Sequence, residues 1–241
     1  MGERESEWRD ASAGLQMIAT AMIIQMMLVG FMLLAILFMI ASRKADGMQT
    51  VAMLLAVVGL IAQIMMVIGV FRFSHQPAPA PSTGLAQAAG GLGIAGLAIS
   101  LYVLFTMVQM GSVGPNSDYE AMESAMKAAE RLPKIEVLAA AIGFVAMLLM
   151  LAAAGLVASH IRRTDIDRKA KTAIAMVLLA AAVFAFVKLG VTPTEPSSLV
   201  AMLAMTTIVQ VVAFVNILGT VRSLAEALVH APAELPPARM L

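Results

Sequence analysis

The sequence predicts an all-α fold, a polytopic transmembrane helical bundle with about six membrane-spanning helices. Six long apolar stretches account for most of the chain, and almost no charge lies inside them. Hydrophobic residues make up 61% of the chain and the mean hydropathy is +0.90, well above the values of a soluble domain. The stretches are continuous and rich in Ala, Leu and Met, which favours helices over the short alternating strands of a membrane barrel.

Each stretch has the length of a membrane span. A helix needs roughly 20 mostly apolar residues to cross a bilayer, because the hydrocarbon core is about 30 Å thick and each residue adds about 1.5 Å. We expect the first span to stay in the mature chain, since it is longer than a cleaved signal peptide and follows an acidic start. The predicted spans cover residues 13–41, 50–71, 88–110, 135–159, 172–190 and 199–221.

The chain divides into three parts. Residues 1–110 hold an N-terminal tail and the first three spans, residues 111–134 form a linker, and residues 135–241 hold the last three spans and a C-terminal tail. In the linker, Ser117 and Glu120 have the spacing of a capping box, which predicts the start of a helix. We expect Pro133 to end this helix before the fourth span begins.

The linker helix is predicted to be amphipathic and interfacial. Tyr119, Met122, Met126 and Ala129 recur at steps of three and four residues and form an apolar stripe. The remaining face is mostly acidic, which disfavours binding to anionic lipid. We expect the stripe to cover the chain's own bundle. The alternative is docking on another protein.

Basic residues predict the orientation. Ten of the 16 lysines and arginines fall on the side that holds both termini, so the positive-inside rule places both termini in the cytoplasm of an inner or plasma membrane. We expect Trp8 to anchor the first span at the membrane interface. The basic cluster between spans four and five is expected to set topology, and its alternative role is contact with anionic lipid headgroups. Its members are Arg162, Arg163, Arg168, Lys169 and Lys171.

The two halves of the chain share a layout. In each half a charged turn follows the first span, and a proline-containing connection follows the second. This layout suggests a 3+3 inverted repeat, an arrangement that many transporters use. Chance similarity remains the default interpretation, because apolar helices resemble one another by composition.

A few polar residues lie inside the spans, where a polar group is costly unless it finds a partner. Gln25, Gln63 and Gln210 fall near the middle of their spans, and Asn216 lies close to Gln210. We expect them to hydrogen-bond between helices, with a central polar site as the alternative. The predicted spans hold no central Asp or Glu, which disfavours ion-coupled carriers. Lys188, near a span end, is expected to extend to the interface.

Small residues predict a close helix contact. Ala89, Gly93, Gly96 and Ser100 follow steps of four, three and four residues in the third span. Such a helix-packing face lets a second backbone approach closely, within the chain or in a homo-oligomer.

The sequence carries no recognisable catalytic, cofactor or metal signature. The chain has no cysteine, and its three histidines lie outside the predicted spans, so thiolate metal sites and paired haem ligands inside the bilayer are excluded. We interpret the 21 methionines as adaptable apolar filler, with a Cu(I) path as the weaker alternative. The Asn-Pro-Ala motifs of aquaporins and the Gly-x-Ser-Gly motif of rhomboid proteases do not occur. No basic footprint for nucleic acid is present.

These observations leave two function classes. We expect a non-catalytic integral membrane protein, a structural or assembly subunit that packs with other membrane subunits or with itself and carries no cofactor. The alternative is a small channel or carrier for a neutral solute or ion through the bundle centre.

Overall fold

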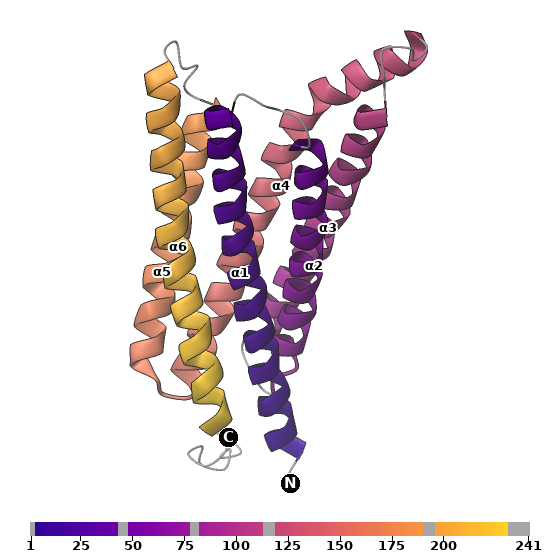
Figure 1. Cartoon of the computed structure of the whole chain (residues 1–241). Helices are drawn as coiled ribbons and strands as arrows, with labels where there is room; N and C mark the ends of the chain where they lie inside the picture. The colour runs from indigo at the N-terminus through magenta and orange to yellow at the C-terminus, as the bar shows by residue number, and fades with distance from the viewer. Residues whose placement is uncertain (1–2, 43–47, 78–81, 113–118, 190–195, 231–241) are drawn as a thin grey trace.

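The computed structural model consists of six helices connected by short segments (Figure 1). It describes residues 3–42, 48–77, 82–112, 119–189 and 196–230, and no strand occurs within these ranges. The helices are α1 (Glu3–Ser42), α2 (Met48–Ser74), α3 (Thr83–Ser112), α4 (Tyr119–His160), α5 (Thr164–Leu189) and α6 (Pro196–His230). The all-helical prediction is confirmed for the described residues.

Five of the helices are long and apolar enough to cross a membrane. Their apolar segments are Glu5–Met32, Met53–Ser74, Thr83–Gln109, Met122–His160 and Ala204–His230. Helix α5 is not among the five. Its first eight residues include five charged ones, Asp165, Asp167, Arg168, Lys169 and Lys171, so its apolar part is short. The span at 172–190 remains a prediction, and residue 190 lies outside the described residues.

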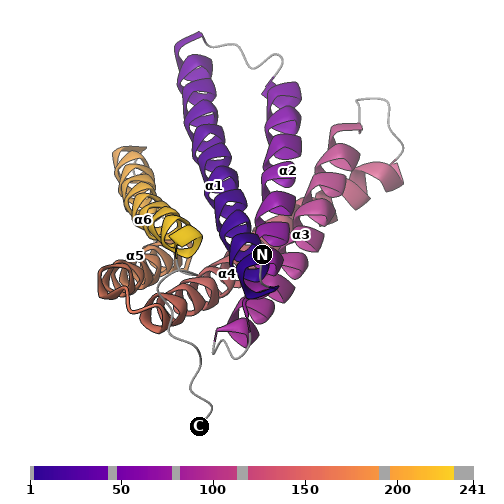
Figure 2. The same cartoon turned by 90° about the horizontal axis from the view of Figure 1, so that it is seen from below.

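The helices form a ring in which each packs against its neighbour along the chain and α6 returns to α1. Seen from below, the ring is close-packed near the viewer, and α1, α2 and α6 diverge away from that end (Figure 2). The start of α1 and the end of α6 lie side by side at the packed end (Figure 1). We call this the terminal end of the bundle and the opposite one the splayed end.

Burial follows this asymmetry. Leu15, Phe73, Leu151, Ile166 and Leu224 come from five helices, are fully buried, and belong to the core at the terminal end. At the splayed end large apolar side chains are open to the surroundings. Examples are Phe31 on α1, Leu54 on α2, Phe105 on α3 and Ile208 on α6. In water, exposure of so much apolar surface would be energetically unfavourable.

Helices α1 and α2 approach each other closely at two glycines. A Cβ atom added at Gly14 would lie 2.5 Å from the Gly69 carbonyl oxygen and 2.6 Å from the Phe73 nitrogen. A Cβ added at Gly69 would lie 2.7 Å from the Gly14 carbonyl oxygen. The two glycines therefore let the backbones touch, the role that small residues have at crossings of membrane helices.

Polar contacts also join helices at the terminal end. The buried Ser12 hydroxyl donates a hydrogen bond of 2.9 Å to the Ala225 carbonyl, which joins α1 to α6. Asp10 on α1 accepts from Arg72 on α2 at 3.2 Å, with His75 at 3.5 Å from the same carboxylate. These contacts fix the depth at which α1 lies against its two neighbours.

The turn between α4 and α5 is a tight helix C-cap. The Arg163 nitrogen donates to the Ala158 carbonyl at 2.8 Å, and the Arg162 nitrogen donates to the Ser159 carbonyl at 3.1 Å. This is the hydrogen-bond pattern of a Schellman motif, whose C′ residue adopts the left-handed conformation. Arg162 occupies that position with a φ of 60°, where glycine is usual.

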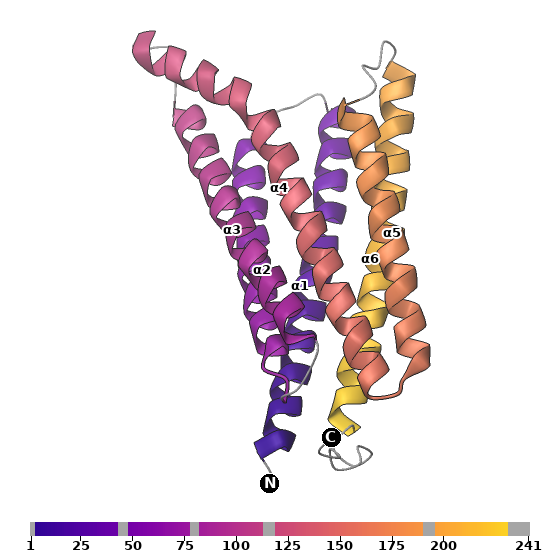
Figure 3. The ribbon, with the colours of Figure 1, turned by 180° about the vertical axis from the view of Figure 1, so that it is seen from behind.

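The structure corrects the prediction that Pro133 ends the linker helix. Helix α4 runs without interruption from Tyr119 to His160, so the linker helix and the fourth span are one element. A proline removes one intrahelical hydrogen bond and kinks a helix but need not end it. Figure 3 shows the first part of α4 leaning away from α5 and α6, over the end of α3. Ser117 of the predicted capping box lies outside the described residues.

Two further expectations are wrong. The stripe was expected to cover its own bundle, yet Tyr119 is 80% and Met126 69% exposed, because the first part of α4 projects beyond the helices it would cover. Trp8 was expected at the membrane interface, yet it is only 4% exposed and belongs to the core. Helix α1 begins at Glu3, so Trp8 already lies among converging helices.

The packing of the two halves is not equivalent. An inverted repeat would place the tightly packed segments of α1 and α4 at opposite ends of the bundle. Helix α1 buries Leu15 and Ile18 near its N-terminus, and α4 buries Leu151 and Val157 near its C-terminus, so both segments lie at the terminal end. The repeat remains a prediction from the sequence.

Candidate functional site

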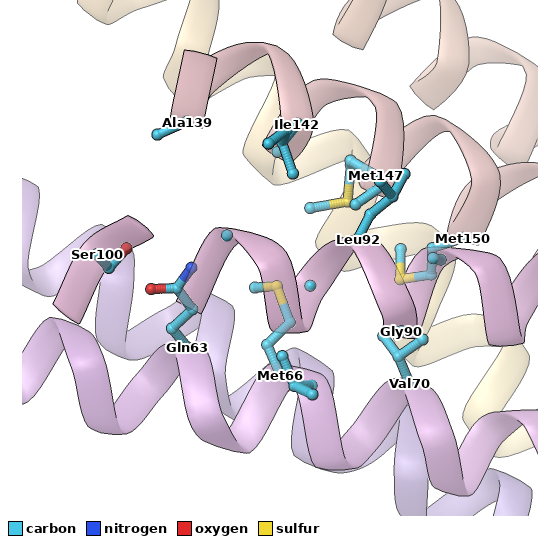
Figure 4. Close-up of a pocket in the computed structure, with 16 residues that line it drawn as sticks. Gln63, Met66, Val70, Gly90, Leu92, Ser100, Ala139, Ile142, Met147 and Met150 are labelled. Carbon is cyan, nitrogen blue, oxygen red and sulfur yellow. The ribbon is translucent and has the colours of Figure 1, made fainter. Parts of the chain in front are cut away.

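Two adjoining cavities lie between α2, α3 and α4. The first holds about 170 Å³ and extends from Val70, Ala89 and Met150 to Gln63 and Ser100 (Figure 4). The second holds about 410 Å³ and continues towards the splayed end. Gln63, Ser100 and Ala139 line both cavities, so the two form one elongated hollow. We call this hollow the three-helix groove.

The groove follows one stripe on each helix. Its lining residues run from Ala56 to Val70 on α2, from Ala89 to Met107 on α3 and from Glu136 to Met150 on α4. The stripes on α2 and α4 each span 14 residue steps, which correspond to about 21 Å of helix. The groove is therefore long and narrow.

Glycines on α3 set the width of the groove on the α2 side. A Cβ at Gly90 would lie 2.9 Å from the Phe71 ring, one at Gly93 would lie 3.0 Å from Val67, and one at Gly96 would lie 3.3 Å from the Gln63 amide nitrogen. Helix α3 is thus held close against α2, as small-residue faces allow. All four residues of the predicted packing face, Ala89, Gly93, Gly96 and Ser100, line the groove.

The α4 side of the groove is open. Gly143 lines the first cavity, and a Cβ added there would meet nothing within 4 Å. Ala139 and Ala146 flank it on the same face of α4. Because these side chains are short, α4 leaves space where a larger residue would fill the contact with α2 and α3.

The lining is apolar apart from a few groups. Gln63 and Ser100 lie where the two cavities meet, and Glu136 lies on the α4 wall of the second cavity. Figure 4 shows the Gln63 amide pointing from α2 into the groove, with methionine and isoleucine side chains around it. The groove offers carbon surface along its length and one amide near its middle.

The predicted mid-span polar residues are not gathered in this groove. Gln63 lines it, whereas Gln25 lies on α1 and Gln210 and Asn216 lie on α6, and none of these three is among the lining residues. The Asn216 amide donates to the Val212 carbonyl of its own helix at 2.8 Å. The Lys188 side chain lies outside the described residues.

The basic cluster lies at the terminal end, at the turn between α4 and α5. Three of its five members contact acceptors of the same chain: Arg163 binds Asp165 at 3.1 Å, Lys171 binds Asp167 at 2.7 Å and Lys169 binds the Ser223 hydroxyl at 2.9 Å. The hydrogen bond from Arg163 lowers the pKa of Asp165, with desolvation opposing the shift and the charge of Arg163 adding to it. Arg162 and Arg168 are exposed.

Within the described residues, no group of three or more histidine, aspartate or glutamate side chains is placed to hold a metal ion. Comparison of the chain with protein-family models, curated proteins and solved structures found no match.

Sequence reasoning found some parts of this site and missed others. The mid-span position of Gln63 and the steps of three and four on α3 were visible in the sequence. The close contact of Gly14 with Gly69 was missed, because isolated glycines form no stripe. The groove was missed because its width depends on how α4 leans, which no local pattern specifies.

Proposed function

We propose that this protein is a non-catalytic integral membrane subunit that packs against another membrane protein through the first turns of α4. Both termini lie in the cytoplasm in this proposal, and the projecting segment lies on the opposite side of the membrane. The observation that carries the proposal is the exposed apolar stripe on that segment.

Membrane insertion is supported by length and by exposure. Five helices have spanning length and apolar composition, and their outward surfaces carry large exposed side chains such as Phe31, Ile61 and Phe105. In lipid such side chains need no protein partner, because hydrocarbon solvates them. The basic cluster lies at the end that holds both termini, as the positive-inside rule requires of a cytoplasmic face.

The stripe gives the proposal its contact surface. Tyr119, Met122 and Met126 are 80%, 48% and 69% exposed, and they share one face of α4. Figure 3 shows that this segment projects past the rest of the bundle. Exposed aromatic and methionine side chains at such a position are typical of contact surfaces, since both residue types are enriched in interfaces.

Charge defines the chemistry of the partner. Glu120, Glu123 and Glu130 lie beside the stripe, and Lys127 forms an ion pair with Glu123 at 2.6 Å. The edge of the stripe is thus acidic on balance. A partner with an apolar surface bordered by lysine or arginine fits it, and the charges at its rim would favour the correct orientation.

Native mass spectrometry after extraction in a mild detergent tests the proposal. We expect a stoichiometric partner with wild type, and at least a tenfold loss of that partner when Met122→Ser and Met126→Ser are combined. The matched control is Arg131→Ser, which changes an exposed residue on the opposite face of the same segment. A monodisperse homo-oligomer without partner, or equal retention in both variants, would contradict the proposal.

The chain has no cysteine, so a single introduced thiol provides a second test. Cysteine at position 126 should crosslink to the partner in native membranes, whereas cysteine at position 131 should not. Crosslinking of equal strength from both positions would mean that the stripe does not select the contact.

The channel or carrier alternative receives less support. A solute path through the bundle needs polar groups in sequence along it. The two cavities of the three-helix groove lie between neighbouring helices, and their lining is mostly carbon. Substituting Gln63→Leu and measuring solute flux in liposomes tests this alternative directly.

A further inference from the structure

We propose that the three-helix groove is a binding site for one hydrocarbon chain of a membrane lipid. The inference depends on the proposed membrane insertion and not on the proposed partner. It assigns a ligand class to a hollow that the contact surface on α4 does not use.

The shape of the groove suits a thin apolar occupant. It is walled by α2, α3 and α4 and runs along all three helices. The two cavities hold about 170 Å³ and 410 Å³. A single extended hydrocarbon chain is much thinner than a helix and matches a hollow that is long, narrow and continuous.

The length and position of the groove also fit a lipid chain. Its extent of about 21 Å along α2 exceeds the hydrocarbon depth of one leaflet, about 15 Å. The groove lies within the apolar segments of α2, α3 and α4, so hydrocarbon rather than water surrounds its mouth in a bilayer. Met107 is 42% exposed and Gly143 faces open space, so a chain can enter from outside the bundle.

The lining selects for hydrocarbon over polar solutes. Ile142, Met147 and Met150 form a carbon and thioether wall on α4, and methionine adapts its shape to an irregular apolar guest. The glycines on α3 keep the opposite wall flat. Gln63 is the main polar interruption of the first cavity, and a chain can pass beside it without using its hydrogen-bonding capacity.

Blocking substitutions test the site. Gly143→Leu introduces a side chain at a point where the Cβ meets nothing within 4 Å, so it fills the groove without forcing helices apart. Gly91→Leu is the matched control, because a Cβ at Gly91 also meets nothing within 4 Å and Gly91 lines neither cavity. Ala139→Leu, at the junction of the two cavities, is a second blocking variant in case the first does not fold.

The measurement is native mass spectrometry of purified protein that has been stripped of loosely bound lipid and then titrated with palmitoyl-oleoyl phosphatidylcholine. We expect one tightly bound lipid per chain in wild type and Gly91→Leu, and at least a tenfold weaker binding in Gly143→Leu and Ala139→Leu. Circular dichroism and gel filtration identify which variants fold. Equal lipid binding by wild type and a folded blocking variant would overturn the proposal.

Two further binding measurements distinguish the hydrocarbon-chain site from a headgroup site and from a site for a polar ligand. Phosphatidylglycerol should bind as tightly as phosphatidylcholine, and binding of phosphatidylglycerol alone would instead indicate a headgroup site and overturn the proposal. Gln63→Leu should bind lipid at least as well as wild type, and loss of binding would show that a polar ligand was recognised. Recovery of the protein in a carbonate supernatant would refute membrane insertion, whereas a membrane-bound protein without a resident lipid would refute only the groove.

Discussion

Replacing Gly14 with alanine should destabilise the protein by about 2 kcal/mol. The new Cβ would lie 2.5 Å from the Gly69 oxygen, 2.6 Å from the Phe73 nitrogen and 2.8 Å from the Arg72 Cβ. Two of these three neighbours are backbone atoms, so relief requires α1 and α2 to separate. Overpacking of this kind costs about 3 kcal/mol at the upper end of its usual range. The higher helix propensity of alanine offsets about 1 kcal/mol.

Gly30→Ala on the same helix is the control. A Cβ at Gly30 meets nothing within 4 Å, so only the helix propensity changes and the variant should gain up to about 1 kcal/mol. Reversible unfolding in mixed micelles with increasing sodium dodecyl sulfate, followed by circular dichroism, measures both. The two substitutions should change the free energy of unfolding in opposite directions. A Gly14→Ala protein as stable as Gly30→Ala would refute the close crossing of α1 and α2.

Three further predictions concern the terminal end. Ser12→Ala removes the buried hydrogen bond from α1 to the Ala225 carbonyl of α6, so the free energy of unfolding should fall by about 1 kcal/mol in the same assay. Arg162→Gly should stabilise the protein by about 1 kcal/mol, because glycine adopts positive φ without strain. The control Arg168→Gly, inside α5, should destabilise the protein by about the same amount. Equal effects of the two substitutions on the free energy of unfolding would contradict the helix cap at Arg162. The pKa of the Asp165 carboxyl should lie below its usual range and rise in Arg163→Ala, measured by NMR titration. Because the folded pKa is the lower one, any stability from this pair is present at neutral pH and is lost in acid, as the pH falls through the folded value.

The sequence predicted the helices well where they are apolar and less well where they are polar. Hydropathy identified the central part of each helix, because only residues in hydrocarbon must be apolar. It could not show that α1 begins at Glu3, since that first segment is charged. The ion pair between Glu5 and Arg9, at 3.1 Å and one turn apart, supports helix there without any apolar signal.

Pro133 shows a different limit of sequence reasoning. A proline disfavours helix locally, but the residues on both sides of it remain helical in α4. The proline removes one backbone hydrogen bond and its ring crowds the carbonyl four residues earlier, and a bend of the helix relieves this crowding. Pro133 is exposed. Whether a helix bends or ends at a proline depends on these surroundings, which the local sequence does not report.

The candidate site was predictable only in part. Gln63 and the α3 glycines could be identified because polarity and spacing are local properties. Their meeting with Ala139 and Gly143 depends on the tilt of α4, which follows from packing among distant parts of the chain. The same reason explains why Gln25 and Gln210, although at comparable positions in their spans, do not line the groove with Gln63.

The crossing of α1 and α2 at Gly14 and Gly69 lies much closer to the terminal end of the bundle than to the splayed end. About 30 Å of α2 extends from that crossing to Met48, so a rotation of about 5° there would move the distant tip by roughly 3 Å. Above the crossing, α3 lies close against α2 at Gly93 and Gly96, so α3 would have to move with α2. A small change in the crossing angle therefore alters the spacing of α1 and α2 much more at the splayed end than in the core at the terminal end.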